Sequence, residues 1–383
     1  MDDMSATFLP LDELRRRRSV KWRTYDPDVL PLWVAEMDVA LAPPIAAALR
    51  AAVARGDTGY VHAGDLAETY AAFSARRYGW APAPARTSLV PDVMHGIAAV
   101  LRLATEPGDH VVINPPVYPP FWHFVHLADR DVREVGLHAG ADGYTLDLAG
   151  LERAFAEGAA AYLLCNPHNP TGSVWDRDAL LAVADLAERH DVLVLADEVH
   201  APLTHDGIVH VPFGALDHPA AQRAVTFVAA SKAWNLPGLK AALTLAGPDA
   251  PPALTTLPHE VQVGTGLFGV LAARAAFAHG EQWLSSLRTR LDDNRRLLAD
   301  LLARHLPAID HRPPDATYLA WLDCRALGLG DDPAAVFLER GRVALNSGHT
   351  FGAQGRGFVR LNLATSPELL DDAVRRMVIA LDN

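Results

Sequence analysis

Apolar runs of strand length alternate with longer stretches of helical period from about Pro44 to residue 280. Residues 178–189, for example, place their apolar side chains on one stripe of a helix and their charged side chains on the other. The expected strands are His110–Ile113, Ala161–Cys165, Val192–Ala196, Val225–Ala229 and Ala241–Ala246. This alternation is typical of a doubly wound α/β layer built on a mainly parallel sheet.

The pattern changes after residue 280. A long helix is expected over Glu281–His305, and a final helix from Pro367. Between them, strands are expected near Thr317–Leu322, Arg342–Leu345 and Phe358–Leu363. We therefore predict a large domain over residues 44–280 and a smaller α+β domain over residues 281–383. The Pro-rich segment 1–43 is expected to cross back to the smaller domain.

Composition excludes several classes of protein. The net charge of −12 over 383 residues disfavours nucleic acid and anionic membranes as partners. The basic run at residues 15–18 is interpreted as a solvated helix face. Two cysteines, Cys165 and Cys324, are too few for a disulfide framework or a zinc cluster. The sequence shows no signal peptide and no membrane-spanning run, so we expect a cytoplasmic protein.

Polar residues follow four of the expected strands. Ile113 is followed by NPPVYPP, Cys165 by NPHNPTG, Ala196 by DEVH and Ala229 by ASKAW. In open sheets of this type, ligands bind beyond the carboxyl ends of the strands. The candidate site is therefore sought in these four loops.

Lys232 and Asp197 are the two charged candidates at these strand ends. A partly desolvated lysine loses its proton more readily and can then form an imine. A carboxylate such as Asp197 can hold a pyridine nitrogen protonated, which makes the ring an electron sink. Each residue also has an ordinary interpretation: Lys232 as a surface lysine in a loop, and Asp197 as the N-cap of the next helix.

Asn169 and Tyr118 lie in loops stiffened by proline. Asn169 in NPHNPTG can donate its amide to a ring hydroxylate and to a substrate carboxylate, although NPTG is also a common turn. Tyr118, between two Pro pairs, can stack on a planar cofactor, and packing in the core is the alternative.

A phosphate and a carboxylate also have candidate partners. The segment LVPDVMHG leads from a strand into a helix whose N-terminus could bind phosphate, which makes Met94 and His95 candidates, with Ser231 supplying a hydroxyl. His95 is otherwise an ordinary first-turn histidine. Arg360 in FVRLNLA could bind a carboxylate through bidentate hydrogen bonds from its guanidinium, or form a structural salt bridge.

Four motifs resemble those of the pyridoxal-5′-phosphate (PLP) enzymes of fold type I, in the class I/II aminotransferase superfamily. In chain order they are NPHNPTG, DEVH, SKAWNLPGLK and RLN. Four further stretches resemble the cystathionine β-lyase or cysteine-S-conjugate β-lyase branch of this superfamily. They are KWRTYDPDVLPLWVAEMD, GYVHAGD, VYPPFWHF and GHTFGAQGRGFVRLNLA. The resemblance covers nearly the whole chain. It implies the PLP-dependent transferase-like fold of aspartate aminotransferase type.

The resemblance also implies roles for residues. Lys232 would carry the cofactor and act as general base, Asp197 would bind the pyridine nitrogen, and Asn169 the ring oxygen. Tyr118 would cover the ring and Arg360 would bind the substrate carboxylate. His200 is a further cofactor-binding candidate in DEVH. Tyr60 would reach the phosphate of the neighbouring subunit's cofactor, which implies a homodimer with shared sites.

Three positions depart from the superfamily pattern. Many aminotransferases have a serine and an arginine touching phosphate where this chain has Ala229 and Lys240. Lysine pairs with phosphate as a point charge, so Lys240 remains a cofactor-binding candidate of uncertain role. Glu36 stands where the branch usually has Asp.

These residues lead to one functional hypothesis and two alternatives. The hypothesis is a carbon–sulfur β-lyase that cleaves cystathionine or related cysteine S-conjugates to a thiol, pyruvate and ammonia. An aminotransferase of a small amino acid would use the same residues. A PLP-containing protein that modulates a transcription factor by binding is the alternative from another class. No metal site is expected, since His123 and His126 have no acidic or cysteine partner at ligand spacing.

Overall fold

A seven-stranded sheet forms the centre of the computed structural model, which describes residues 4–140 and 143–382. Its strand order is β2 (Thr87–Val90), β10 (Ala242–Ala246), β9 (Val225–Val228), β8 (Leu193–Asp197), β7 (Ala161–Cys165), β3 (His110–Ile113) and β4 (Asp131–Glu134). β10 pairs antiparallel with β2 and β9, and the other neighbours pair in parallel. The predicted mainly parallel α/β sheet is confirmed.

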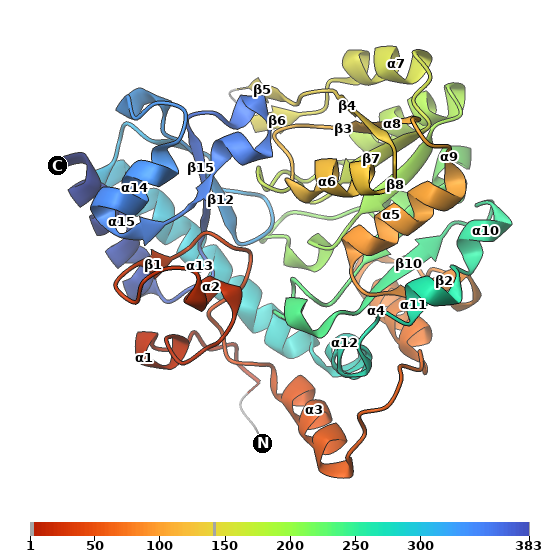
Figure 1. Ribbon diagram of the computed structural model, residues 1–383, viewed down its shortest axis with the longest axis horizontal. Helices are drawn as coiled ribbons and strands as arrows, with labels where there is room; N and C mark the ends of the chain where they lie inside the picture. The colour runs from red at the N-terminus through yellow and green to blue at the C-terminus, as the bar shows by residue number, and fades with distance from the viewer. Residues whose placement is uncertain (1–3, 141–142, 383) are drawn as a thin grey trace.

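Both faces of this sheet are covered by helices, which explains its continuous apolar strands. Along β7, Leu163 and Cys165 pack into one buried cluster, whereas Tyr162 and Leu164 pack into another. This is the two-residue period of a strand. The first cluster includes α5 (Val93–Ala104) and α6 (Pro120–Leu127), and the second includes α7 (Leu148–Ala156) and α8 (Arg177–Arg189) (Figure 1).

A third buried cluster joins this layer to the C-terminal part of the chain. It contains side chains of α3 (Pro43–Arg55), α4 (Leu66–Tyr78), α12 (Leu267–His279) and the long helix α13 (Glu281–His305). The C-terminal part carries a four-stranded antiparallel sheet with α14 (Pro333–Gly341) and α15 (Pro367–Asp382), drawn in blue in Figure 1. Its strand order is β11 (Asp310–His311), β12 (Leu319–Asp323), β15 (Phe358–Asn362) and β14 (Asn346–Ser347).

The N-terminal segment returns to this C-terminal sheet region. Strand β1 (Leu30–Pro31) pairs in parallel with β13 (Val343–Ala344). The helices α1 (Leu11–Leu14) and α2 (Val20–Arg23) precede it. The domain boundaries at residues 43 and 280 stay predictions.

The remaining short elements are β5 (His138–Gly140), β6 (Gly143–Thr145), α9 (Pro219–Arg223), α10 (Pro252–Thr255) and α11 (His259–Gln262). Among the residues that the structure describes, no helix is long and apolar enough to cross a membrane. The location of the protein in the cell stays a prediction.

The strand expected near residues 342–345 forms as β13, which covers Val343–Ala344 and pairs with β1. β14 (Asn346–Ser347) was not predicted, because it is a separate two-residue strand of polar sequence, which pairs with β15. β4 was not predicted because it is an edge strand of polar sequence, DVRE, with exposed ends.

Candidate active site

The loops that follow the parallel strands meet at one cavity of about 290 Å³. Asp197 ends β8, and Asn169 and Lys232 follow β7 and β9 by four residues each. Tyr118 follows β3. Every predicted cofactor-binding residue except Tyr60 lines this cavity: Met94, His95, Tyr118, Asn169, Asp197, His200, Ser231, Lys232 and Lys240. The carboxyl ends of the strands thus bring together residues that lie far apart in the sequence.

Lys232 presents its amine to the cavity. Burial lowers the pKa of this amine to about 8, and the nearby Arg360 guanidinium acts in the same direction, against the opposing effect of Asp197. Its Nζ donates to the backbone carbonyl of Ala35 at 3.4 Å. A partly buried amine with a depressed pKa is suited to nucleophilic attack on an aldehyde and to proton transfer.

Asp197 is buried beside the lysine loop. Burial raises the pKa of its carboxyl to about 6, although a bond from the Val199 amide to Oδ1 at 3.1 Å opposes this rise. The next helical turn, residues 201–203, is preceded by His200 and not by Asp197. The carboxylate therefore does not serve as that helix's N-cap, and it stays available to pair with a cation in the cavity.

Arg360 lies next to the cavity and is buried against the loop after β7, the N-terminal segment and Phe351. Its Nη1 donates to Asn169 Oδ1 at 2.9 Å and its Nη2 to the carbonyl of Trp33 at 3.1 Å. Its guanidinium lies 4.9 Å from the ring centre of Phe351. Within the described ranges, its buried Nε has no hydrogen-bond partner, and no carboxylate forms a salt bridge with it.

The start of α5 holds a charged cluster of Asp92, His95 and Lys240, of which the sequence analysis missed only Asp92. Asp92 caps the helix: its Oδ1 accepts from the His95 amide at 3.0 Å and from the His95 ring at 2.8 Å. Lys240 Nζ donates to Asp92 Oδ2 at 2.9 Å. The amide of His95 is thus already bonded, which leaves the amides of Val93 and Met94 for an anion at this helix end. An acidic residue directly before a helical run is an N-cap signal that could have revealed Asp92.

His200 and Tyr118 complete the cavity, whereas Tyr60 does not reach it. His200 is buried, its Nδ1 has no partner among the described residues, and burial lowers its pKa well below the usual value. Tyr118 packs its ring edge-to-face on Phe121, and burial raises the pKa of its hydroxyl. The side chain of Tyr60 is 99% exposed.

These groups fit PLP by their chemistry. The cofactor has an aldehyde, a basic ring nitrogen, a ring hydroxyl and a phosphate, and the cavity offers an amine, a carboxylate, an amide and a helix N-terminus with Lys240 nearby. Nε of Arg360 and Nδ1 of His200 are buried polar atoms without a partner in the described part of the chain, and a polar ligand would satisfy them.

Comparison with known proteins agrees with this reading. The model of the family described as aminotransferase class I and II matches residues 27–377. The chain belongs to this family. A provisionally named cystathionine beta-lyase of Mycobacterium leprae is 47% identical over 98% of both chains. The cystathionine beta-lyase of Corynebacterium glutamicum is 36% identical over 98% of this chain and 100% of its own.

Two solved structures are similar over nearly the whole chain. Cystalysin from Treponema denticola, which contains PLP, has a TM-score of 0.92 and 26% identity, with 100% of this chain and 99% of that chain covered. The PLP-bound C-S lyase from Staphylococcus hominis has a TM-score of 0.90 and 25% identity, covering 98% and 99%. The predicted fold and superfamily branch are confirmed, and the expected cofactor is the one that both structures hold.

Proposed function

We propose that this PLP-dependent family member is a carbon–sulfur β-lyase that acts on cystathionine or a related cysteine thioether. Relatives named cystathionine beta-lyase support it, at 47% and 36% identity. The single structural observation that carries the proposal is the buried Arg360 guanidinium beside the amine-bearing cavity, whose Nε has no partner among the residues that the structure describes. An α-carboxylate would supply the missing acceptor while the reacting carbons face Lys232.

In this proposal Lys232 moves the proton at Cα. When bound, PLP supplies an aldehyde that takes up the substrate amino group and a ring that accepts the electron pair left at Cα. The depressed pKa of about 8 lets Lys232 accept the Cα proton near neutral pH. Asp197 keeps a positive charge at the ring nitrogen, because an ion pair in a buried site favours both charged partners.

Asn169 and Arg360 orient the substrate, and other groups hold the cofactor. Arg360 Nη1 donates to Asn169 Oδ1 and so orients this amide, which leaves Nδ2 of Asn169 free to donate to the ring oxygen. Lys240, the N-terminus of α5 and Ser231 stand at the phosphate end, and Tyr118 covers the ring. His200 stays neutral in its buried position and can donate or accept one hydrogen bond.

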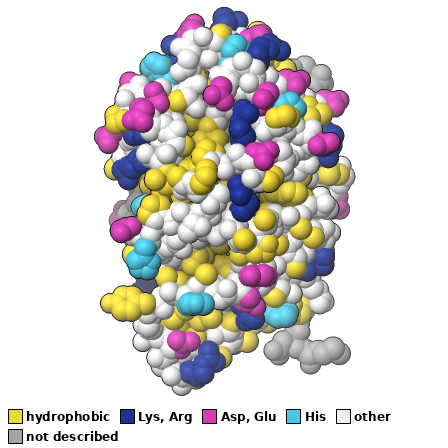
Figure 2. Space-filling model, turned by 90° about the vertical axis from the view of Figure 1, so that its right-hand side faces the viewer, with side chains coloured by type: hydrophobic (Ala, Val, Ile, Leu, Met, Phe, Trp, Pro, Cys, Tyr) yellow, Lys and Arg dark blue, Asp and Glu magenta, His cyan; other side chains and the backbone are white. Residues whose placement is uncertain are grey.

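A homodimer is part of the proposal, with Tyr60 of each chain reaching the partner's cofactor. Two observations support it. The fully exposed Tyr60 has no packing role within its own chain, and hydrophobic side chains gather on the face that carries α5, α10 and α11 (Figure 2). Contiguous apolar surface is typical of a face that another chain covers.

The test is a visible spectrum followed by a product assay on the purified protein. We expect a PLP absorption band and catalytic release of pyruvate from cystathionine and other cysteine thioethers. Lys232→Ala, which removes the amine, is the control and should release no pyruvate above background. Stoichiometric 2-oxo acid with pyridoxamine phosphate, in place of catalytic pyruvate, would select an aminotransferase and overturn the proposal.

A further inference from the structure

The segment Trp33–Asp38, here called the strap, is pinned to the rest of the protein through its own backbone. Each carbonyl from Trp33 to Asp38 accepts a hydrogen bond from a residue outside the strap. The donors come from the lysine loop, the C-terminal sheet region and the N-terminal helices. Because so many separate elements converge on it, the strap has a single position relative to the cavity.

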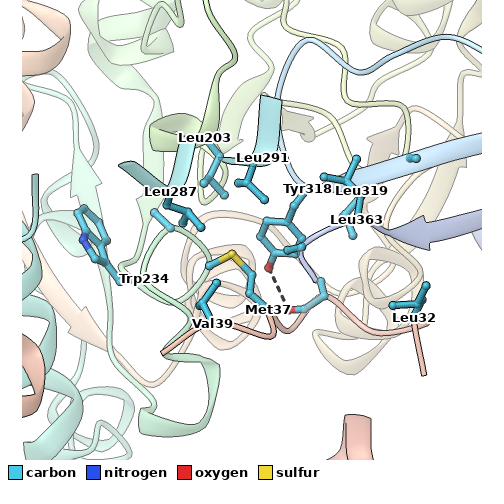
Figure 3. Packing of buried hydrophobic residues seen from close by; sticks show 14 of the residues in the cluster. Leu32, Met37, Val39, Leu203, Trp234, Leu287, Leu291, Tyr318, Leu319 and Leu363 are labelled. Atoms are coloured by element: carbon cyan, nitrogen blue, oxygen red, sulfur yellow. Dashed lines mark hydrogen bonds between the residues drawn. The ribbon is translucent and has the colours of Figure 1, made fainter. Parts of the chain in front are cut away.

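Two of these bonds come from the proposed catalytic and substrate-binding groups. Lys232 Nζ donates to the Ala35 carbonyl at 3.4 Å, and Arg360 Nη2 donates to the Trp33 carbonyl at 3.1 Å. The buried Tyr318 hydroxyl donates to the same Ala35 oxygen at 3.1 Å, the dashed line in Figure 3. The Ala35 carbonyl therefore accepts hydrogen bonds from both the Lys232 amine and the buried Tyr318 hydroxyl.

The far end of the strap is held by an ion pair with no solvent contact. Lys21 Nζ lies 2.8 Å from Asp38 Oδ2, and both side chains are 0% exposed. Trp22 Nε1 donates to Asp38 Oδ1 at 3.1 Å, and Lys21 also donates to the Glu36 carbonyl at 3.0 Å. A buried pair is costly to desolvate and is weak evidence for stability. Its fixed geometry suits a positioning role.

Asn235 connects the strap to the lysine loop. Its side chain makes two bonds to the backbone of Met37, one to the amide and one to the carbonyl, both 2.8 Å long. Its own backbone has a φ of 57°, in the left-handed region that asparagine tolerates. Since Asn235 is only three residues after Lys232, this clamp ties the strap to the turn that carries the lysine.

We propose that Lys21, Asp38, Asn235 and Tyr318 are positioning residues that hold the Ala35 carbonyl as the acceptor for the amine of Lys232 when that amine is released from the cofactor. The inference rests on the proposed role of Lys232. During the Cα step, the proton passes from Cα to Nζ while the electron pair stays with Cα. An N–H of Lys232 bonded to Ala35 leaves the nitrogen lone pair directed away from the strap, where it can meet that proton.

Tyr318→Phe is the mildest test, because it removes one hydroxyl from a buried ring. Tyr162→Phe is the matched control: Tyr162 is also fully buried, and its hydroxyl donates one bond, to Asn114 Oδ1 at 2.5 Å, away from the strap. We expect Tyr318→Phe to lower kcat about tenfold with little change in KM, since small misplacements of reacting groups are costly. The control should stay within about twofold of wild type.

The primary isotope effect with Cα-deuterated substrate separates positioning from general destabilisation. It should rise in Tyr318→Phe, because proton transfer becomes slower than the other steps, and it should be unchanged in Tyr162→Phe. Thermal midpoints should fall by similar amounts in both variants, since each loses one buried hydrogen bond.

Two further variants test the rest of the strap. Asn235→Gly keeps the left-handed backbone and removes the clamp, and Lys21→Met/Asp38→Asn removes both buried charges together so that neither is left alone. Both should bind PLP with the wild-type band and show the same lower kcat and larger isotope effect.

The positioning proposal is overturned if Tyr318→Phe, Asn235→Gly and Lys21→Met/Asp38→Asn all turn over substrate with wild-type kcat and isotope effect. That result would leave the proposed lyase activity untouched. A wild-type protein that neither takes up PLP nor releases pyruvate would instead sink the proposed function itself. The variants therefore test the positioning proposal, and the wild-type protein tests the proposed function.

Discussion

The cavity wall that follows the parallel strands, the strand-end wall, carries Asn169, Asp197 and Lys232 within four residues of their strands, whereas the strap belongs to a distant part of the chain. The strap carbonyl that accepts from Lys232 lies 197 residues away in the sequence, and the one that accepts from Arg360 lies 327 residues away. The strand-end wall presents side chains to the cavity, and the strap contacts two of the proposed site residues through its backbone carbonyls. In our proposals chemistry and positioning come from these two regions, and each can be perturbed separately.

The strongest test of the strand-end wall is Lys232→Ala. Removal of the amine deletes the proposed general base, a contribution of about 10²–10⁴-fold in typical enzymes, so we expect kcat to fall by about 10³-fold or more. Pyruvate release under saturating substrate measures this. A variant with more than a tenth of wild-type kcat would show that another group moves the Cα proton.

Asp197→Asn should separate function from stability. The folded pKa of about 6 lies above the usual 3.8, so the cofactor-free chain loses stability as the pH rises from about 4 to about 6. At pH 7 the cofactor-free variant should therefore be more stable than wild type, by on the order of 3 kcal/mol. Urea unfolding from pH 4 to pH 8 measures the difference. It should be small at pH 4, and the variant should bind PLP more weakly.

Arg360→Lys tests the proposed carboxylate-binding residue, which contacts the strap. Lysine keeps a positive charge but loses the planar fork that reaches Asn169, Trp33 and a carboxylate together. We expect kcat/KM for an amino-acid thioether to fall about 10²-fold. The matched control is a thioether amine without the carboxylate, for which wild type and variant should differ little. Equal losses on both compounds would contradict carboxylate recognition.

The smallest effect is expected at the phosphate end. Lys240→Ala removes the cation that pairs with Asp92 Oδ2 near the proposed phosphate site, so PLP binding should weaken about tenfold while binding of pyridoxal, which lacks the phosphate, should not change. Cofactor titration of the cofactor-free protein measures both. Asp92→Asn/Lys240→Ala should recover part of the loss. Equal weakening for the two compounds would place Lys240 outside the phosphate site.

The sequence by itself determined the sheet, most of its strands and the loops that carry the chemistry. Strand and helix periods are local, and in a parallel sheet the carboxyl ends of neighbouring strands meet at one edge. For this reason Asp197 and Lys232 could be placed together from their strands alone. Their catalytic roles remain proposals.

Only the tertiary structure decided which distant segments meet. Three features depend on contacts across the chain: the separate pairings of β13 with β1 and of β14 with β15, the Asp92–Lys240 pair, and the bond from Lys232 to the strap. Backbone carbonyls are present at every residue, so no side-chain pattern reveals which of them will accept the lysine. Packing of the N-terminal segment against the lysine loop and against β15 makes that choice.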